Sequence, residues 1–76
     1  MRVTTGTPLS TEEMMELSPT NDALIVLGDY RCRYMAAAPG QEIEVDDTYY
    51  DSETGLAFGL RKVNKPGYQY LAFRIN

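Results

Sequence analysis

Apolar and polar side chains alternate along most of the chain from residue 23 onward. Residues 23–27, "ALIVL", form an apolar run of strand length, and residues 30–36, "YRCRYMA", alternate strictly. The glycine–aspartate pair at 28–29 suits a two-residue hairpin turn, because glycine tolerates a positive φ. Such a turn places Ile25 opposite Cys32, so both strands present their apolar side chains on one face. The pattern predicts a hairpin.

A second alternating stretch, "QEIEVDDTYY" at 41–50, directs Ile43 and Val45 inward. Continuing this alternation would bury Asp47. We therefore expect a β-bulge near residues 46–47 that returns Tyr50 to the inner face, since bulges commonly bend the strands of small barrels.

Two further stretches complete the β pattern. "LAFGLRKV" at 56–63 and "YQYLAFRI" at 68–75 alternate, and Pro66-Gly67 between them suits the centre of a type II turn. "RVTT" at 2–5 is a candidate short strand at the beginning of the chain.

One segment has the period and the end signals of a helix, residues 11–18. Ser10 followed by Glu13 forms a capping box in "LSTEEMMELSP", and Pro19 ends the pattern. Two turns of helix do not persist alone. We expect Met14 and Leu17 to pack as a lid over an open end of the β-structure.

These elements predict a mainly β fold in one domain, residues 1–76. It comprises a small antiparallel five-stranded bent sheet or partly open barrel over 23–76, with one short N-terminal helix. The strands from "GDYRCRYM" to the end resemble an SH3-like barrel. The resemblance concerns the order of strands and turns, and it implies no activity.

The composition limits the chemical functions that the side chains can perform. The chain has 76 residues, one cysteine and no histidine, so neither an intrachain disulfide nor a histidine base is available, and we predict no enzyme, cofactor or metal. The net charge is −4, divided into −8 over residues 1–53 and +4 over residues 54–76. Because no apolar run approaches the length of a membrane span, we expect a cytoplasmic protein.

Two features of the sequence invite a functional interpretation that local structure explains better. The acidic stretch before Gly55 could hold calcium, but in an EF-hand register starting at Asp51 the fifth position is glycine and the twelfth is Lys62. We therefore read it as a hairpin corner, with Asp51 bonding nearby backbone. Cys32 lies between two arginines that point to the opposite face of its strand, and we expect it to be a small core residue.

Six tyrosines make up an unusual share of the apolar residues. Tyrosine is typical of core edges and of protein interfaces, and with nearby arginines it also forms stacking platforms for single-stranded nucleic acid. All three interpretations stay open at this point.

The sequence favours a small non-enzymatic protein-binding module, an accessory, inhibitory or regulatory factor of the kind found in bacteria and phages. The last strand has no covering segment, so it is an expected open edge for a partner strand or for a homodimer. The predicted contacts are Tyr68, Tyr70, Arg74, Arg61, Tyr49 and Tyr50.

Two alternatives belong to other classes. One is a small barrel that binds single-stranded nucleic acid through its basic C-terminal part. The other is an acidic decoy that occupies a partner's nucleic-acid-binding groove with a patch of carboxylates. That acidic patch consists of Glu42, Glu44, Asp46, Asp47, Asp51 and Glu53.

Overall fold

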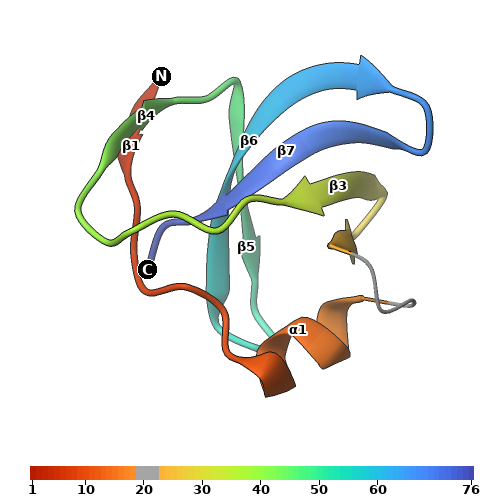
Figure 1. Ribbon diagram of the computed structural model, residues 1–76, viewed down its shortest axis with the longest axis horizontal. Helices are drawn as coiled ribbons and strands as arrows, with labels where there is room; N and C mark the ends of the chain where they lie inside the picture. The colour runs from red at the N-terminus through yellow and green to blue at the C-terminus, as the bar shows by residue number, and fades with distance from the viewer. Residues whose placement is uncertain (19–22) are drawn as a thin grey trace.

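The computed structural model describes residues 1–18 and 23–76, and within them the chain forms two sheets and one helix (Figure 1). The elements in chain order are β1 (Arg2–Thr4), α1 (Thr11–Leu17), β2 (Leu24–Leu27), β3 (Tyr30–Tyr34), β4 (Glu42–Glu44), β5 (Asp47–Asp51), β6 (Leu56–Lys65) and β7 (Tyr68–Arg74). The larger sheet has the strand order β2-β3-β7-β6-β5, and β1 pairs with β4 in the smaller one.

The predicted fold class is confirmed: the chain is mainly β, with a five-stranded bent sheet that forms a half-barrel and one short N-terminal helix. The five-stranded sheet is mixed, however, and not wholly antiparallel. β3 and β7 run parallel, with Cys32 opposite Tyr70. Every other strand pair is antiparallel, among the residues that the structure describes.

The first hairpin has the predicted register. Leu27 lies opposite Tyr30 and Ile25 lies opposite Cys32, on either side of a turn in which Gly28 has a φ of 60°. The positive φ is the conformation that a two-residue hairpin turn demands of its first residue. The alternation of apolar side chains and the length of the turn therefore specify the same register between β2 and β3.

The expectation that the C-terminal strand is an open edge is wrong. β7 lies in the middle of the sheet, bonded to β3 on one side and to β6 on the other, so both of its backbone edges are occupied. The outer strands of this sheet are β2 and β5. The homodimer through the C-terminal strand was expected from an open edge, and β7 is not an edge strand of the sheet.

The stretch at 41–50 is two strands and not one bulged strand. The chain bends after Val45, so that β4 pairs with β1 while β5 pairs with β6. Tyr50 does not reach the inner face: it lies opposite Ala57 and is 65% exposed. Tyr49 takes the inner position because it lies opposite the buried Phe58.

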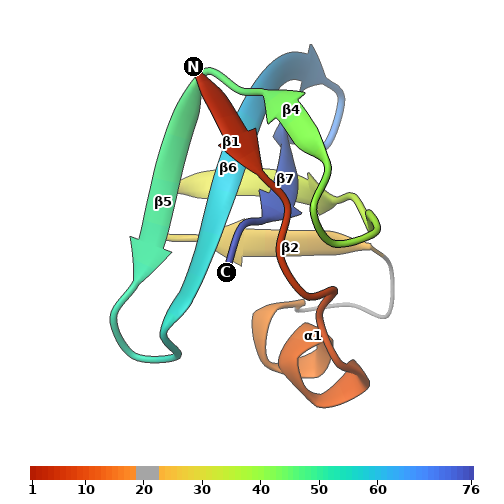
Figure 2. The same cartoon turned by 90° about the vertical axis from the view of Figure 1, so that its left-hand side faces the viewer.

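The main core occupies the concave face of the large sheet, and α1 closes one end of it (Figure 2). The buried cluster consists of Ile25, Leu27, Cys32, Leu56, Phe58, Leu60 and Ala72. Met14 and Leu17 pack against this cluster, as expected of a lid. The capping box is also present, with Glu13 N–H donating to Ser10 Oγ at 3.1 Å and Ser10 N–H donating to Glu13 Oε1 at 2.8 Å. The helix ends at Leu17; Pro19 lies outside the described residues.

The small sheet of β1 and β4 covers the opposite face of the large sheet. Val3 of β1 and Val45, which directly follows β4, lie against Gly59 in β6: a Cβ at position 59 would stand 2.9 Å from Val45 Cγ1. Phe73 lies opposite Gly59 and is also buried. β6 is therefore covered on both faces around Gly59, and glycine at this position permits the close approach.

The described part of the chain contains no helix with the length and apolar character that crossing a membrane requires.

Candidate functional site

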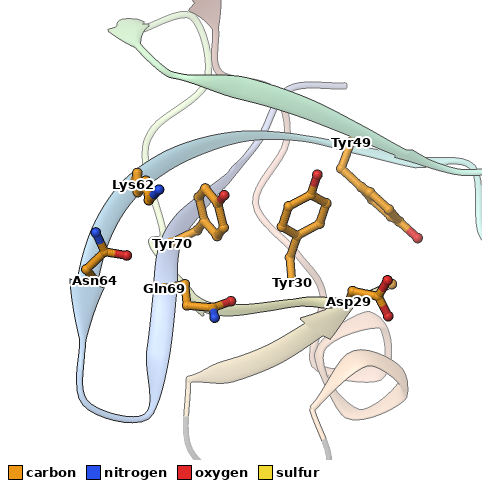
Figure 3. Close-up of a pocket in the computed structure, with 8 residues that line it drawn as sticks. Asp29, Tyr30, Tyr49, Lys62, Asn64, Gln69 and Tyr70 are labelled. Carbon is orange, nitrogen blue, oxygen red and sulfur yellow. The ribbon is translucent and has the colours of Figure 1, made fainter.

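Three tyrosines from three strands come together at one end of the concave face (Figure 3). Tyr30 begins β3, Tyr49 lies in β5 and Tyr70 lies in β7. The Tyr30 ring meets the Tyr70 ring edge to face, with centroids 5.1 Å apart, and meets the Tyr49 ring in the same manner at 6.0 Å. Edge-to-face contacts are a favoured arrangement of aromatic rings, so the three side chains support one another.

These rings line a pocket of about 480 Å³, which we call the tyrosine pocket. Its lining consists of Gly28, Asp29, Tyr30, Tyr49, Lys62, Asn64, Gln69 and Tyr70. This volume falls within the range of about 300–1,000 Å³ that small-ligand and side-chain pockets occupy. Three of the eight lining residues are aromatic and four are polar or charged, so the lining is more polar than that of most small-ligand pockets.

The β2–β3 turn forms one end of the tyrosine pocket. Gly28 lies against the Tyr49 ring, and a Cβ at position 28 would stand 3.2 Å from the ring edge and from the hydroxyl. Asp29 follows Gly28 beside Tyr49, while Lys62 and Asn64 lie beyond Tyr70 at the other end (Figure 3). The pocket therefore carries opposite charges at its two ends.

Negatively charged side chains lie around Tyr30. The nearby Asp47 carboxylate raises the pKa of Tyr30, and its Oδ2 lies 3.5 Å from the Tyr30 hydroxyl. Burial adds to this increase in pKa, and the charge of Asp29 contributes a smaller part. Two carboxylates from different elements thus act on the same ring.

Neither charge at the ends of the pocket is neutralised within residues 1–18 and 23–76. The Asp29 carboxylate makes no ion pair or hydrogen bond there, and the ammonium group of Lys62 makes none either. Asp47 accepts hydrogen bonds from Thr48 N–H and the Tyr30 hydroxyl but has no cationic partner among the described residues. The lining of the tyrosine pocket thus keeps one carboxylate, Asp29, and one ammonium, Lys62, for a ligand, and the Asp47 carboxylate lies outside the lining beside the Tyr30 hydroxyl.

Two of the six predicted contact residues, Tyr49 and Tyr70, line the tyrosine pocket. Tyr50 points away from it on the other face of β5, and Tyr68 is half-buried outside the lining. Tyr30 was not among the predicted contacts, because its alternation with Cys32 assigned it to the core. Its place directly after a turn was the available signal, since a residue at the end of a strand lies where the core ends.

The two predicted arginine contacts serve the fold. The Arg61 guanidinium stands 5.3 Å from the centroid of the Phe73 ring, and its Nε donates to the Glu44 carbonyl at 3.0 Å. Arg74 is ion-paired to Glu13 in α1. Both side chains are therefore held by contacts within the chain.

The acidic residues of the predicted patch do not gather on one surface. Glu42 and Glu44 lie on β4, where they pair with Arg2 and with the N-terminal ammonium. Asp51 and Glu53 lie at the β5–β6 turn, at the opposite end of β5 (Figure 2). Asp46 accepts a hydrogen bond from Lys62 N–H.

The acidic loop before Gly55 has the geometry of a hairpin corner, as predicted. Asp51 Oδ1 accepts a hydrogen bond of 3.0 Å from Glu53 N–H, and Gly55 has a φ of 76°. No group of three or more potential metal-ligating side chains occurs in the described part of the chain.

Cys32 lies within the core, as predicted, and is fully buried. Burial raises the pKa of Cys32 to about 11, so the side chain is a protonated thiol at neutral pH. A buried neutral thiol is a poor nucleophile.

Comparison of the chain with protein-family models, with curated proteins and with solved structures finds no match.

Proposed function

We propose that this chain is a non-enzymatic protein-binding module that holds a segment of a partner protein in the tyrosine pocket. The observation that carries the proposal is the meeting of three tyrosine rings from β3, β5 and β7 around about 480 Å³ of open space. Tyrosine is enriched at protein interfaces because its ring packs against apolar groups of the partner while its hydroxyl forms hydrogen bonds with polar groups or water.

The form of the pocket supports binding in preference to catalysis. Its lining has no cysteine, serine or histidine that could act as a nucleophile or base, and the fully buried Cys32 is outside it. The rings are fixed by strand pairing and by each other, so a ligand meets a surface that is already formed. Preformed surfaces bind with a smaller loss of entropy than surfaces that order on binding.

The nucleic-acid alternative is less favoured by the arrangement of the charges. Stacking platforms need cations beside the aromatic rings to hold phosphates. Arg31 and Arg33 alternate with Cys32 and therefore project from the convex face, whereas the tyrosines line the concave one. Lys62 is a cation of the pocket lining, but Asp29 in the same lining and Asp47 beside the Tyr30 hydroxyl would repel phosphate.

The acidic-decoy alternative lacks a continuous surface. Its six carboxylates are divided between β4 and the two ends of β5, and several of them already bond to groups within the chain. A decoy for a nucleic-acid-binding groove requires charges in one row, so this interpretation has no supporting arrangement.

Affinity capture from a lysate of the native host, with nuclease present, tests the proposal. The wild-type chain should retain a defined protein at two salt concentrations. Tyr49→Ala should lose that protein, and Tyr50→Ala should keep it, because the two tyrosines are neighbours in β5 that point to opposite faces. Tyr50→Ala is therefore the matched control for Tyr49→Ala, because each variant removes one tyrosine ring from β5.

Gln69→Trp provides a second variant that leaves every packed ring in place. Gln69 is an exposed residue of the lining, so a bulky side chain there obstructs the pocket without removing core contacts. Circular dichroism and thermal unfolding establish that each variant is folded. Capture that disappears with nuclease, that fails for the wild type, or that persists in both Tyr49→Ala and Gln69→Trp would overturn the proposal.

A further inference from the structure

The charges around the tyrosine pocket indicate which chemistry its ligand carries. We infer that the pocket receives a basic side chain, arginine or lysine, from the partner protein, with the cation over the tyrosine rings and toward Asp29, while Asp47 acts on the site from beside the Tyr30 hydroxyl. The inference rests on the proposed protein-binding function and adds the class of residue that is recognised.

The aromatic walls suit a cation. In an edge-to-face pair one ring presents its positive edge to the face of the other, and all three tyrosines of the two pairs also border the pocket. The face of an aromatic ring carries the negative end of its quadrupole and attracts ammonium or guanidinium groups within about 6 Å. Tyr30 contacts both other rings, so it stands at the centre of this surface.

The two carboxylates strengthen the same preference. Asp47 lies 3.5 Å from the Tyr30 hydroxyl, and the charges of Asp47 and Asp29 both raise the pKa of Tyr30, which reports a negative potential at the ring. Neither carboxylate has a cationic partner in the described residues. A basic side chain would supply the missing counter-charge.

Lys62 determines at which end of the pocket a cation binds. Its ammonium group lies beyond Tyr70, at the other end of the pocket from Asp29 (Figure 3). A cation in the pocket is attracted to the Asp29 end and repelled from the Lys62 end. The chain as a whole has a charge of −4, which further favours a partner with a basic segment.

An NMR titration with defined probes tests this inference on the intact chain. The probes are Nα-acetyl-arginine amide and an alternating Gly-Arg hexapeptide, compared with the matching glutamate and proline compounds. The basic probes should shift the ring resonances of Tyr30, Tyr49 and Tyr70 in a saturable manner. The Tyr50 ring, on the opposite face of β5, should not move.

Two substitutions should change the affinity for the Gly-Arg hexapeptide in opposite directions. Asp29→Asn should weaken binding by about two- to fivefold, the equivalent of one charge interaction near the surface, and Lys62→Gln should strengthen it by a similar factor. Asparagine is compatible with the β2–β3 turn, so Asp29→Asn retains the hairpin. Glu53→Gln and Lys65→Gln repeat the same charge changes outside the lining and should leave the affinity unchanged.

The outcomes separate this inference from the function beneath it. Stronger shifts with the glutamate or proline probes would overturn the basic-residue inference, as would opposite signs for Asp29→Asn and Lys62→Gln. The absence of ring shifts with the basic probes at millimolar concentration would also overturn it. In each case nuclease-resistant capture that depends on Tyr49 would still support protein binding by the pocket.

Discussion

Arg74 at the end of β7 is ion-paired to Glu13 in the first turn of α1, with Nη1 and Oε1 3.1 Å apart. The same carboxylate oxygen accepts the Ser10 N–H of the capping box. One acidic side chain therefore both begins the helix and fastens it to the central strand of the sheet. The lid over the core depends on this pair as well as on Met14 and Leu17.

Replacing Glu13 with glutamine should reduce stability near neutral pH by up to about 1 kcal/mol, because glutamine can complete the capping box but carries no charge for Arg74. The bond from Ser10 N–H and, after it, the charge of Arg74 lower the pKa of Glu13 from 4.5. A lowered pKa means that the ionised form stabilises the fold above pH 4.5 and that this contribution is lost as pH falls through the lowered value.

The difference between Glu13→Gln and wild type should accordingly shrink in acid. Urea unfolding monitored by circular dichroism at neutral pH and below the lowered pKa measures it. Glu16→Gln, an exposed position in the same helix, is the control for the change in net charge. A difference that stays constant with pH would contradict the expected role of the ionised carboxylate.

Gly59→Ala should destabilise the fold by about 1–3 kcal/mol, the usual cost of adding a methyl group to a filled space. The new Cβ would lie 2.9 Å from Val45 Cγ1, so the small sheet must move away from the large one. Val45→Ala makes room for it. In a double-mutant cycle measured by chemical unfolding, the two changes should couple by about 0.5–3 kcal/mol. Gly59→Ala combined with the distant, exposed Val26→Ala should show additive losses.

Cys32 should resist thiol reagents in the folded chain at pH 8. Its side chain is fully buried and its pKa is raised to about 11, so little thiolate forms and reagents cannot reach it. Labelling by a chromogenic disulfide should follow global unfolding as urea is added. A Cys32→Ala chain with Thr54→Cys in the exposed β5–β6 turn should react at once, and equal rates for the two chains would contradict the buried position.

Asp47→Asn should lower the pKa of Tyr30 toward its ordinary value of 10.0, because the charge of Asp47 is the largest cause of the increase. Asparagine retains an oxygen that can accept the hydroxyl proton, so the substitution mainly removes charge. NMR detection of the Tyr30 ring during an alkaline titration gives the pKa directly. Asp51→Asn at the far end of β5 should leave it unchanged, and the same pKa in Asp47→Asn as in wild type would show that the field has another source.

Local patterns were sufficient to predict the hairpin of β2 and β3 and the start of α1. A two-residue turn together with strict alternation allows only one register that buries Ile25 and Cys32 on the same face. The capping box likewise depends on two residues three positions apart, Ser10 and Glu13. In both cases all the interacting groups lie close together in the sequence.

The place of β7 depends on contacts that local patterns do not contain. Alternation in residues 68–75 indicates which side chains share a face. It does not indicate whether the strand lies at the edge or in the middle of its sheet. The parallel pairing of Cys32 with Tyr70 joins segments that are far apart in the chain. The tyrosine pocket results from this long-range pairing, so Tyr49 and Tyr70 could be named as contacts from the sequence while their meeting with Tyr30 could not.

The split of residues 41–50 has a similar cause. Val45 packs against Gly59 on the face opposite the main core, whereas Asp47 and Tyr49 lie opposite the core residues Leu60 and Phe58, so the chain changes face at the bend. Asp47 stays exposed because it lies at the end of the strand beside the Tyr30 hydroxyl. A bulge at residues 46–47 would be needed only if the inner face were dry along its whole length. Where a sheet is only a half-barrel, an inward position near its rim still meets water.

The central position of β7 has a consequence for biosynthesis. On the ribosome, the β2–β3 hairpin and the strands β5 and β6 emerge before the strand that unites them, so neither half of the large sheet can complete its hydrogen bonding until residues 68–74 have left the exit tunnel. During that interval β3 and β6 present unpaired backbone edges to other nascent chains. Shielding of such edges would therefore matter most until β7 has been synthesised, and a chain that stops before residue 68 would leave the two halves of the large sheet unjoined.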